Sequence, residues 1–521
     1  MADETRVRTE KTGRIGHEAV TEATYVFDRV GLARNPQNSF LVSGNPSRSS
    51  RRSKGAKVIF SHFTTNSAVL KEVCDKFLRA ERFHGKIEAI NANLRRFLMN
   101  LEKILSDLKN CPCGREHTFD LKVCEIGHGV LARTAEILAG AGFPRRVLLV
   151  ADENTIAAAD GILDVLAEGG FDVKTRIYEN MTHARAEEVA ELMGLAADCD
   201  GVISVGSGSL NDICRVAAYK TDKPLCIFGT APSMDGFASD TAPILENNFK
   251  SSWQARQPMV ILGDTTVLAA APAELKAAGF GDMVGKYIGL VDWRISKLLI
   301  DEYYCEKIAA LTEEAVRRIM SYADDVQSGG EEAAGAIMEA LVLTGLAMKL
   351  AASSRPASGA EHVISHYWEC YKIVRGMWPE YHGKKVGVAT VVCNRLYRKL
   401  AEIEAVDPIA DPTDWDEVYT KYDPQLHADV KKLNNPTITD KVDPALLREK
   451  WGEIREIIKT TLPETEILID AMKRAGAAIT PEEVNVNPEL YADGLRFHGY
   501  MRYRLLLTRL LPMLKIDPLE V

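Results

Sequence analysis

Short apolar runs that alternate with helical stretches constrain the fold of this chain more than any other feature. Five such runs occur, over residues 146–151, 172–178, 201–205, 224–228 and 258–262. Stretches with helical character separate them, for example over residues 155–167 and 210–219. Nearly continuous apolar strands that alternate with helices are typical of a parallel sheet covered on both faces. The pattern predicts an α/β doubly wound parallel-sheet (Rossmann-like) domain.

The second half of the chain has a different pattern. After Leu268 the strand signals stop, and helical periodicity continues over residues 313–321, 331–352, 384–403 and 491–514. Strands and helices followed by helices alone predict a separate all-helical domain. We expect the α/β domain to span residues 99–270 and the helical domain residues 271–521. Residues 407–444 are rich in Pro and Asp and are expected to form a long surface connection.

Residues 1–98 resemble neither half. They mix polar stretches with a Ser, Arg and Lys run over residues 46–54, which is typical of a solvated, poorly ordered extension. Binding of an acidic partner is the alternative for this run. One or two helices are expected between residues 65 and 108. A compact pattern begins just after Met99, so we expect Met99 to be the natural start.

Charge and cysteine content narrow the class of protein. With 521 residues and a net charge of -9, the chain lacks the basic excess that nucleic-acid binding usually needs. Its ten cysteines are irregularly spaced, which favours a reduced, cytoplasmic protein over a disulfide framework. The sequence contains no apolar run long enough to suggest a membrane span and no apolar leader. Small-molecule chemistry is the expected role.

The loop after the third apolar run is glycine-rich, with the sequence GSGSLND from Gly206 to Asp212. Such a turn lets backbone N–H groups approach a pyrophosphate, and the N-terminus of the following helix favours its negative charge. A tight turn with Asp212 as a first-turn acid is the alternative. Asp152 directly follows the first run, where it would either receive ribose hydroxyls or cap the helix beginning near Thr155.

A second loop, over residues 229–239, follows the next strand. Carboxyl ends of parallel strands share one edge of a sheet, so both loops are expected to open into one crevice. Three hydroxyl side chains there are candidates for cofactor contacts: Thr230, Ser233 and Ser239. The carboxylate of Asp235 is a candidate acceptor for a substrate hydroxyl.

The residues that suggest metal chemistry lie in the helical half. His362 and His366 are four residues apart, so a helix would place both imidazoles on one face, and His382 follows closely. Imidazole is the commonest protein ligand for transition metals, although histidines so spaced are more often ordinary core or surface residues. Asp282 and Lys286 are also four residues apart. They would either form a solvated ion pair on one helix face, or Asp282 would be the carboxylate ligand of the metal.

A further cluster, Cys111, Cys113 and His117, has the spacing of metal ligands. No fourth ligand lies nearby in the sequence, which favours free thiols in a turn over a structural zinc site.

Four motifs in this order resemble one family. The segments GSGSLND, TAPSMDGFAS, GFGDMVGKY and SSRPASGAEHVISH followed by YHG are similar to the sn-glycerol-1-phosphate dehydrogenases. This family belongs to a wider group with glycerol dehydrogenases, iron-containing alcohol dehydrogenases and 3-dehydroquinate synthase. The CPCGREH segment and the late HGYMRYRLLLTRLL segment are similar to bacterial members. The resemblance covers residues 99–514 and implies a dehydroquinate synthase-like fold.

The resemblance also implies roles for individual residues. It implies metal binding by Asp282, His362 and His382, and substrate binding by Asp235 and His366. We further expect catalytic roles for Asp282, His366 and Lys286, and substrate contacts by Asp282 and Arg355. Lys286 and Arg355 are candidates for the substrate phosphate by their location alone. The implied cofactor-binding residues are Asp152, Gly206, Gly208, Ser209, Leu210, Asn211, Asp212, Thr230, Ala231, Pro232, Ser233 and Ser239. The sequence departs from the wider group at Ser207, where a third glycine is usual, and at Lys286, where iron-dependent members have a histidine.

The implied activity is reversible reduction of dihydroxyacetone phosphate to sn-glycerol 1-phosphate. It would use NAD(H) or NADP(H) and one divalent metal (Zn, Ni or Fe), in a homodimer or larger homo-oligomer, with no nucleic acid or membrane partner. Two alternatives stay open: a dehydrogenase for glycerol or another polyol, and a non-catalytic nucleotide-binding sensor. 3-Dehydroquinate synthase is disfavoured, because it would have a glutamate at the position of Asp282.

Overall fold

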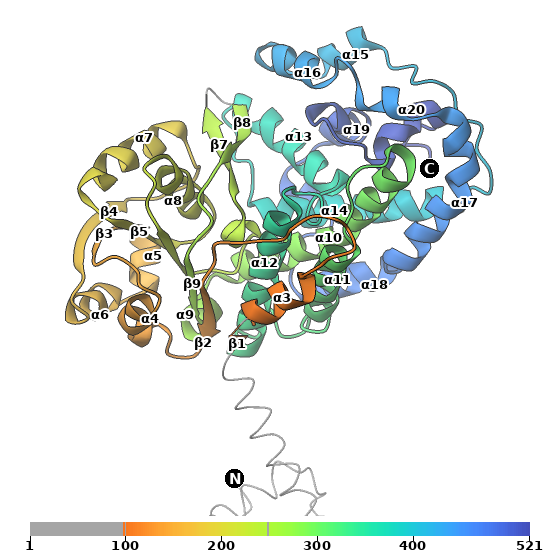
Figure 1. The fold of residues 1–521 in the computed structure, drawn as a ribbon. Coiled ribbons are helices and arrows are strands. Elements are labelled where there is room, and N and C mark those ends of the chain that lie inside the picture. Colours follow the sequence, from red (N-terminus) through yellow and green to blue (C-terminus); the bar gives the residue numbers. More distant parts are fainter. Residues whose placement is uncertain (1–96, 99, 247–248) are drawn as a thin grey trace, which may run out of the picture. The chain divides into compact units, whose positions relative to one another are not determined.

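The computed structural model describes residues 97–98, 100–246 and 249–521 (Figure 1). Apart from Phe97 and Leu98, the predicted extension over residues 1–98 lies outside these residues, as do the basic run at residues 46–54 and the expected start at Met99. Of the helices expected between residues 65 and 108, the structure describes one, α3 (Leu101–Leu108).

The first half of the described chain is built around a seven-stranded sheet. Its strand order is β1-β2-β9-β6-β5-β3-β4, and every neighbouring pair is parallel except β1 with β2. The strands are β1 (Phe97–Leu98), β2 (Val123–Gly127), β3 (Arg146–Asp152), β4 (Asp172–Tyr178), β5 (Gly201–Gly206), β6 (Leu225–Gly229) and β9 (Val260–Asp264). The predicted doubly wound α/β fold is confirmed, and all five predicted strands are present within two residues of their expected bounds.

The central strands are largely apolar at successive positions because both faces of the sheet are covered. In β3, Val147 and Leu149 belong to one core cluster, whereas Leu148 and Val150 belong to another. The helices of this half are α4 (Thr134–Gly140), α5 (Glu153–Ala158), α6 (Ile162–Glu168), α7 (Ala186–Leu195) and α8 (Gly208–Lys220). Each fully buried aliphatic side chain contributes about 1.5–3 kcal/mol of transfer free energy. Two-sided burial therefore selects apolar residues at successive positions rather than at alternate ones.

Two local predictions differ from the structure. The helix expected over residues 155–167 is divided into α5 and α6, because Gly161 adopts a left-handed conformation (φ 87°) between them. A two-stranded antiparallel hairpin, β7 (Thr241–Glu246) and β8 (Phe249–Gln254), was not predicted. It follows the second loop and matters for the site described below.

The rest of the described chain is helical, as predicted (Figure 1). The principal helices are α9 (Thr265–Ala270), α10 (Ala273–Ile300), α11 (Glu306–Met320), α12 (Glu331–Ala351), α13 (Ala360–Val374), α14 (His382–Leu400), α17 (Pro444–Thr461), α18 (Thr465–Arg474) and α19 (Pro488–Phe497). Residues 95–521 form one compact unit. The domain boundary at residue 270 therefore stays a prediction.

The chain after α14 is less regular than expected. The predicted connection over residues 407–444 contains short helices, α15 (Trp415–Thr420) and α16 (His427–Leu433). The helix expected over residues 491–514 ends at Phe497 and is followed by two short 3-10 turns and α20 (Leu511–Leu514). The backbone N–H of Leu507 donates to the buried carboxylate of Asp292 (2.9 Å). This long-range hydrogen bond takes the place of a bond within a helix. The periodicity of the sequence does not reveal such a contact.

Helix α12 is the one described helix long and apolar enough to cross a membrane by length and composition. Of its apolar window, 89% is buried inside the protein. Its apolar character is therefore that of a core helix.

Candidate active site

Three side chains with metal-binding atoms converge where α10, α13 and α14 meet. Asp282 comes from the middle of α10, His362 from the first turn of α13, and His382 is the first residue of α14. One ligand atom from each lies within 4.8 Å of the other two. All three were predicted as ligands from motifs that are up to 100 residues apart in the sequence. One carboxylate and two imidazoles form a donor set that suits Zn, Ni, Fe and Co.

A buried acid orients His362. The carboxylate of Glu361 lies 2.5 Å from Nδ1 of His362, while Nε2 of the same ring lies 3.5 Å from Asp282 Oδ1. Glu361 also accepts a hydrogen bond from the backbone N–H of Gly359 (2.9 Å). A carboxylate behind a histidine fixes its tautomer and turns the other nitrogen toward the metal. This arrangement supports a ligand role for His362, and the residues present fit a divalent metal.

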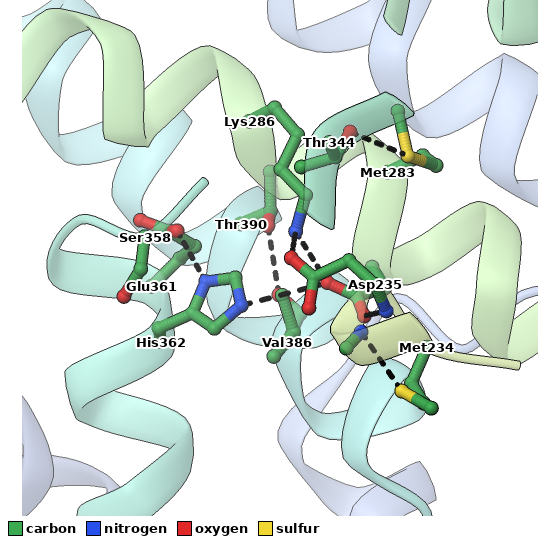
Figure 2. Close-up of polar contacts among 12 residues, drawn as sticks. Met234, Asp235, Met283, Lys286, Thr344, Ser358, Glu361, His362, Val386 and Thr390 are labelled. Atoms are coloured by element: carbon green, nitrogen blue, oxygen red, sulfur yellow. Dashed lines mark hydrogen bonds and ion pairs between the residues drawn. The ribbon is translucent and has the colours of Figure 1, made fainter. Parts of the chain in front are cut away.

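The ammonium of Lys286 lies between two carboxylates (Figure 2). It donates to Asp282 Oδ1 and to Asp235 Oδ2, each at 2.6 Å, and its side chain is fully buried. The backbone N–H of Asp235 donates to the other oxygen of Asp282 (3.0 Å). Of the two interpretations considered for Asp282 and Lys286, the solvated ion pair is wrong, because both side chains are buried and form an ion triad with Asp235. The triad connects the loop after β6 to α10.

The triad perturbs the pKa values of its members. Burial and the negative charge of Asp282 raise the pKa of Asp235. Burial also disfavours ionised Asp282, but the charge of Lys286 and a hydrogen bond from His362 outweigh it and hold the pKa of Asp282 well below its usual range. The two carboxylates in turn raise the pKa of Lys286 despite its burial. Asp282 is thus ionised and ready to bind a cation.

Two close approaches of the backbone position these residues. A side chain at Gly279 would overlap with the carbonyl of Pro232, so α10 touches the loop that carries Asp235. A side chain at Gly383 would overlap with the carbonyl of Ala278, so α14 lies directly against α10. The spacing between Asp282 and His382 is therefore set by backbone contact.

His366 lies beside the metal-ligand set, one turn after His362. Its ring stacks near that of His382, with 5.7 Å between centroids, and its Nδ1 lies 3.3 Å from Glu369. Burial lowers the pKa of His366 to about 4, so the ring is neutral at pH 7.

Cations gather around Glu369. Lys250 from β8 donates to this carboxylate (3.0 Å), Lys385 lies 3.3 Å from it, and the charge of Arg502 acts on it as well. Lys250 also acts electrostatically on Asp212 in the glycine-rich loop. Three cations facing one carboxylate leave a net positive charge beside His366. Sequence analysis missed Lys250, because the hairpin that carries it was not predicted.

The two predicted cofactor loops lie side by side. They follow the adjacent strands β5 and β6, and the backbone N–H of Thr230 donates to the carbonyl of Gly206 (3.3 Å). Ser207 occupies the N-cap position of α8 without a capping hydrogen bond from its side chain, and its hydroxyl lies 2.5 Å from that of Ser233. The arrangement is a strand, a glycine-rich turn and a helix N-terminus, which is the setting that a pyrophosphate needs.

Inside this region several predicted residues have structural partners. Asn211 accepts from the buried hydroxyl of Ser204 (2.7 Å), and Asp212 pairs with the buried Arg215 (3.1 Å). Burial raises the pKa of Asp212 to about 6. The backbone of α8 is therefore firmly held next to the loop, while cofactor contacts by its residues stay a prediction.

Asp152 caps α5, one of the two roles considered for it. Its carboxylate accepts from the N–H of Thr155 (2.8 Å) and from that of Met181 (3.3 Å). Ser239 accepts from the N–H of Thr241 (3.1 Å). Cofactor binding by Asp152 and Ser239 is not tested by these contacts.

Arg355, one of two candidates for the substrate phosphate, is buried and has its guanidinium bonded to protein groups. Its guanidinium bonds to Glu302, to the hydroxyl of Ser296 (3.1 Å) and to the carbonyl of Leu505 (2.9 Å). The other candidate, Lys286, is bound to Asp235 and Asp282.

Sequence reasoning also missed Glu361, although an acid next to a histidine in an apolar helix is a usable signal.

The chain is similar to several known proteins. The family model for iron-containing alcohol dehydrogenases matches residues 125–272. A Geobacillus stearothermophilus protein named glycerol-1-phosphate dehydrogenase is 32% identical over 409 residues, which cover 76% of this chain and 93% of the relative. A Methanosarcina barkeri protein of the same name is 33% identical over 273 residues, covering 52% and 75%.

Solved structures support the fold. An iron-containing alcohol dehydrogenase from Corynebacterium glutamicum aligns with a TM-score of 0.52 at 14% identity, covering 77% of this chain and 97% of the other. An NADH-dependent butanol dehydrogenase from Thermotoga maritima aligns with a TM-score of 0.51 at 16% identity, with the same coverage. Coverage of nearly the whole length of the Geobacillus relative decides the family. This chain belongs to the glycerol-1-phosphate dehydrogenase family.

Proposed function

We propose that the protein is a metal-dependent NAD(P)H oxidoreductase that interconverts dihydroxyacetone phosphate and sn-glycerol 1-phosphate. The observation that carries the proposal is the convergence of Asp282, His362 and His382 on one point. Asp282 bonds to the loop after β6, and that loop contacts the glycine-rich loop after β5. Three protein ligands leave positions open for a substrate oxygen, as in catalytic rather than structural metal sites. The names of the curated relatives support the same substrate and cofactor.

A divalent metal and a nicotinamide cofactor would each supply part of the chemistry of this reaction. A divalent metal at this site supplies Lewis-acid stabilisation of developing negative oxygen charge, and the nicotinamide supplies or accepts the hydride. Asp282, His362 and His382 would hold the metal, and the loops after β5 and β6 would hold the dinucleotide.

The remaining residues bind and orient the substrate. Asp235, held by Lys286, offers an acceptor for a substrate hydroxyl at the edge of the metal-ligand set. His366 is neutral at pH 7, so it can hydrogen-bond the substrate and carry a proton near His382. We propose Lys286 as a positioning residue, because its ammonium is bound to Asp235 and Asp282.

The phosphate of the substrate requires positive charge. We place it near Lys250, Lys385 and Arg502, whose net positive charge beside Glu369 and His366 supports this choice. Lys286 and Arg355 are less suitable, because Lys286 is shared by two carboxylates and the guanidinium of Arg355 is bonded to three protein groups, whereas cations outnumber the carboxylate around Glu369. The net positive charge of these three cations beside His366 also favours a phosphate ester as substrate over an unphosphorylated polyol such as glycerol.

One assay tests the function. Protein reconstituted with Zn²⁺, Ni²⁺ or Fe²⁺ is given dihydroxyacetone phosphate or dihydroxyacetone with NADH or NADPH. We expect metal-dependent oxidation of the cofactor with a strong preference for the phosphate ester. Equal rates with dihydroxyacetone would favour the polyol dehydrogenase, and no oxidation with any metal would favour the non-catalytic sensor.

A substitution tests the phosphate site. Lys250→Gln should raise the KM for dihydroxyacetone phosphate about 10- to 100-fold, because a charge-assisted hydrogen bond contributes roughly 1.5–3 kcal/mol. The control is Lys174→Gln. Lys174 lies on the outer strand β4 and donates to the carbonyl of Leu195, so its replacement should leave KM unchanged. A Lys250→Gln enzyme with an unchanged KM would place the phosphate elsewhere.

Other properties are proposed from the sequence. A net charge of -9 and the absence of a disulfide pattern support a cytoplasmic enzyme without nucleic-acid or membrane partners. We also propose a homodimer or larger homo-oligomer, which size-exclusion chromatography with light scattering would test.

A further inference from the structure

A second group of metal-binding side chains lies outside the proposed active site. Cys111, Cys113, His117 and Cys305 each offer one ligand atom, and these four atoms all lie within 4.8 Å of one another. The first three form the CPCGREH segment, whereas Cys305 lies 188 residues after His117 and precedes α11. The fold therefore supplies the fourth ligand that the sequence lacked nearby.

The spacing of these atoms suits one tetrahedral ion. A zinc with Zn–S bonds of about 2.3 Å and a Zn–N bond of about 2.0 Å separates two sulfurs by about 3.8 Å, and a sulfur from a nitrogen by about 3.5 Å. The sulfurs of Cys111 and Cys305 are 3.5 Å apart. Nε2 of His117 is 3.1 Å from Cys113 Sγ and 3.8 Å from Cys305 Sγ. Small side-chain shifts would complete the tetrahedron.

The surroundings orient the ligands as metal sites require. Nδ1 of His117 lies 2.9 Å from the carbonyl of Leu350 in the last turn of α12, which leaves Nε2 facing the sulfurs. Ligating histidines almost always donate their other N–H in this way. The backbone N–H groups of Arg115 and Ile308 hydrogen-bond to the sulfurs of Cys113 and Cys305, which helps to hold both sulfurs in place.

A positive charge lies close to the cluster. The hydroxyl of Tyr303 donates to Cys113 Sγ (3.5 Å), and the guanidinium of Arg115 stacks over the Tyr303 ring at 3.5 Å from its centroid. Three thiolates and one neutral imidazole on a divalent ion carry a net charge of about -1. Arg115 contacts the ring whose hydroxyl bonds to Cys113, so its positive charge lies near the cluster and offsets part of that negative charge. Ordinary buried thiols need no such neighbour.

We propose that Cys111, Cys113, His117 and Cys305 bind a structural Zn²⁺ ion, distinct from the metal bound at Asp282, His362 and His382. Binding replaces the three S–H bonds by Zn–S bonds, and the three protons are released to solvent. Four protein ligands leave no open position, so the ion has a structural rather than a catalytic role. It ties residues 111–117 to the start of α11 and, through His117, to the end of α12.

Metal content and cobalt spectra test the proposal on the full chain. Wild-type protein purified with Zn²⁺ present should contain about one equivalent more zinc than Cys305→Ser, by inductively coupled plasma mass spectrometry. Cys199→Ser is the matched control, because Cys199 is also buried but lies outside the cluster, and it should keep the full zinc content. The difference between variants is independent of how much metal the active site holds.

Cobalt distinguishes the two sites directly. Wild-type protein loaded with Co²⁺ should show thiolate-to-cobalt charge transfer in the near ultraviolet, which the active-site ligands cannot produce because they include no thiolate. His117→Cys should keep the ion and strengthen this absorption, since four cysteines also form structural zinc sites, whereas His117→Ala should weaken the binding of the ion. These spectra decide the case even if Cys305→Ser fails to fold.

Two outcomes would overturn the proposal. One is a wild-type protein without thiolate-to-cobalt absorption after loading with excess Co²⁺ under reducing conditions. The other is a Cys111–Cys305 disulfide in freshly purified protein, detected by mass spectrometry of a non-reduced digest. If the proposed dehydrogenase activity were absent while the zinc difference persisted, only the proposed function would fail.

Discussion

Replacement of Lys286 by methionine tests the ion triad at the centre of the candidate site. Methionine keeps much of the length and the apolar stem of lysine but removes its ammonium. In the wild type that ammonium donates to Asp235 and Asp282 at 2.6 Å each, with no exposed side-chain surface. In the metal-free variant two buried carboxylates would face each other without a cation.

The structure sets the size of the effect. Removing one partner of a buried ion pair typically costs about 3–5 kcal/mol, because the remaining charge is buried without compensation. Here two carboxylates lose the same partner, so we expect at least the upper part of that range at pH 8. The pKa of Asp235 is already raised by burial and by Asp282, and loss of Lys286 raises it further. A folded-state pKa above the unfolded value means that the variant loses stability as pH rises through it.

Urea unfolding of metal-free protein at pH 5 and pH 8 measures both effects. The matched control is Lys297→Met on the same helix, where Lys297 forms another i,i+4 pair with Asp301. Both members of that pair are largely exposed, with side-chain exposures of 48% and 88%. Exposed pairs contribute about 0–1 kcal/mol, so the control should change little.

Added metal sharpens the test. A divalent ion next to Asp282 replaces part of the missing positive charge, so the deficit of Lys286→Met relative to wild type should shrink when Zn²⁺ is restored. If Lys286→Met lost less than about 1 kcal/mol without metal at pH 8, or lost more at pH 5 than at pH 8, the reasoning would be wrong.

Three further predictions concern other parts of the chain. His498 is buried and bonded to the carbonyl of Gly494, and burial lowers its pKa from 6.5 to about 4. Its contribution to stability is complete above pH 6.5 and should fall by on the order of 3 kcal/mol as pH drops to 4, a slope that calorimetry should find reduced in His498→Gln. Gly279→Ala should cost about 1–3 kcal/mol and raise the KM for the cofactor, because the added methyl overlaps with Pro232, whereas Gly452→Ala in α17 meets open space and should be neutral or stabilising in the same unfolding assay. His366→Ala should keep its metal by mass spectrometry while kcat/KM falls about 10²- to 10⁴-fold, and loss of metal together with activity would instead make His366 a ligand.

The parallel sheet could be predicted because burial on both faces leaves a direct mark on the sequence. Residues 201–206 are buried without exception, so both faces of β5 are under apolar selection, and the polar Ser204 in it bonds to Asn211. The β7–β8 hairpin left no such mark, since its residues are mixed in burial and include Pro243 and two serines. For the same reason Lys250, which it carries, escaped notice.

The candidate site divides in the same way. Asp282, His362 and His382 could be named as candidate metal ligands because the segments that carry them resemble one family, and the structure brings the three side chains together. The buried position of Lys286 and the approach of Cys305 to Cys111 could not be predicted, since both depend on how distant helices pack. The sequence alone left Asp152 undecided between two roles, and the structure adds the contacts of a helix cap.

The direct contact between α10 and α14 bears on how the enzyme can be re-engineered. With no side chain between Gly383 and the backbone of α10, the carboxylate and one imidazole of the metal-ligand set stand at a separation that surface substitutions cannot adjust. His362 instead stands on α13, where Glu361 sets its orientation. A laboratory selection for a larger or smaller ion should therefore accumulate changes around Glu361 and along α13. Libraries that vary α10 or α14 at their crossing should yield mostly unfolded protein.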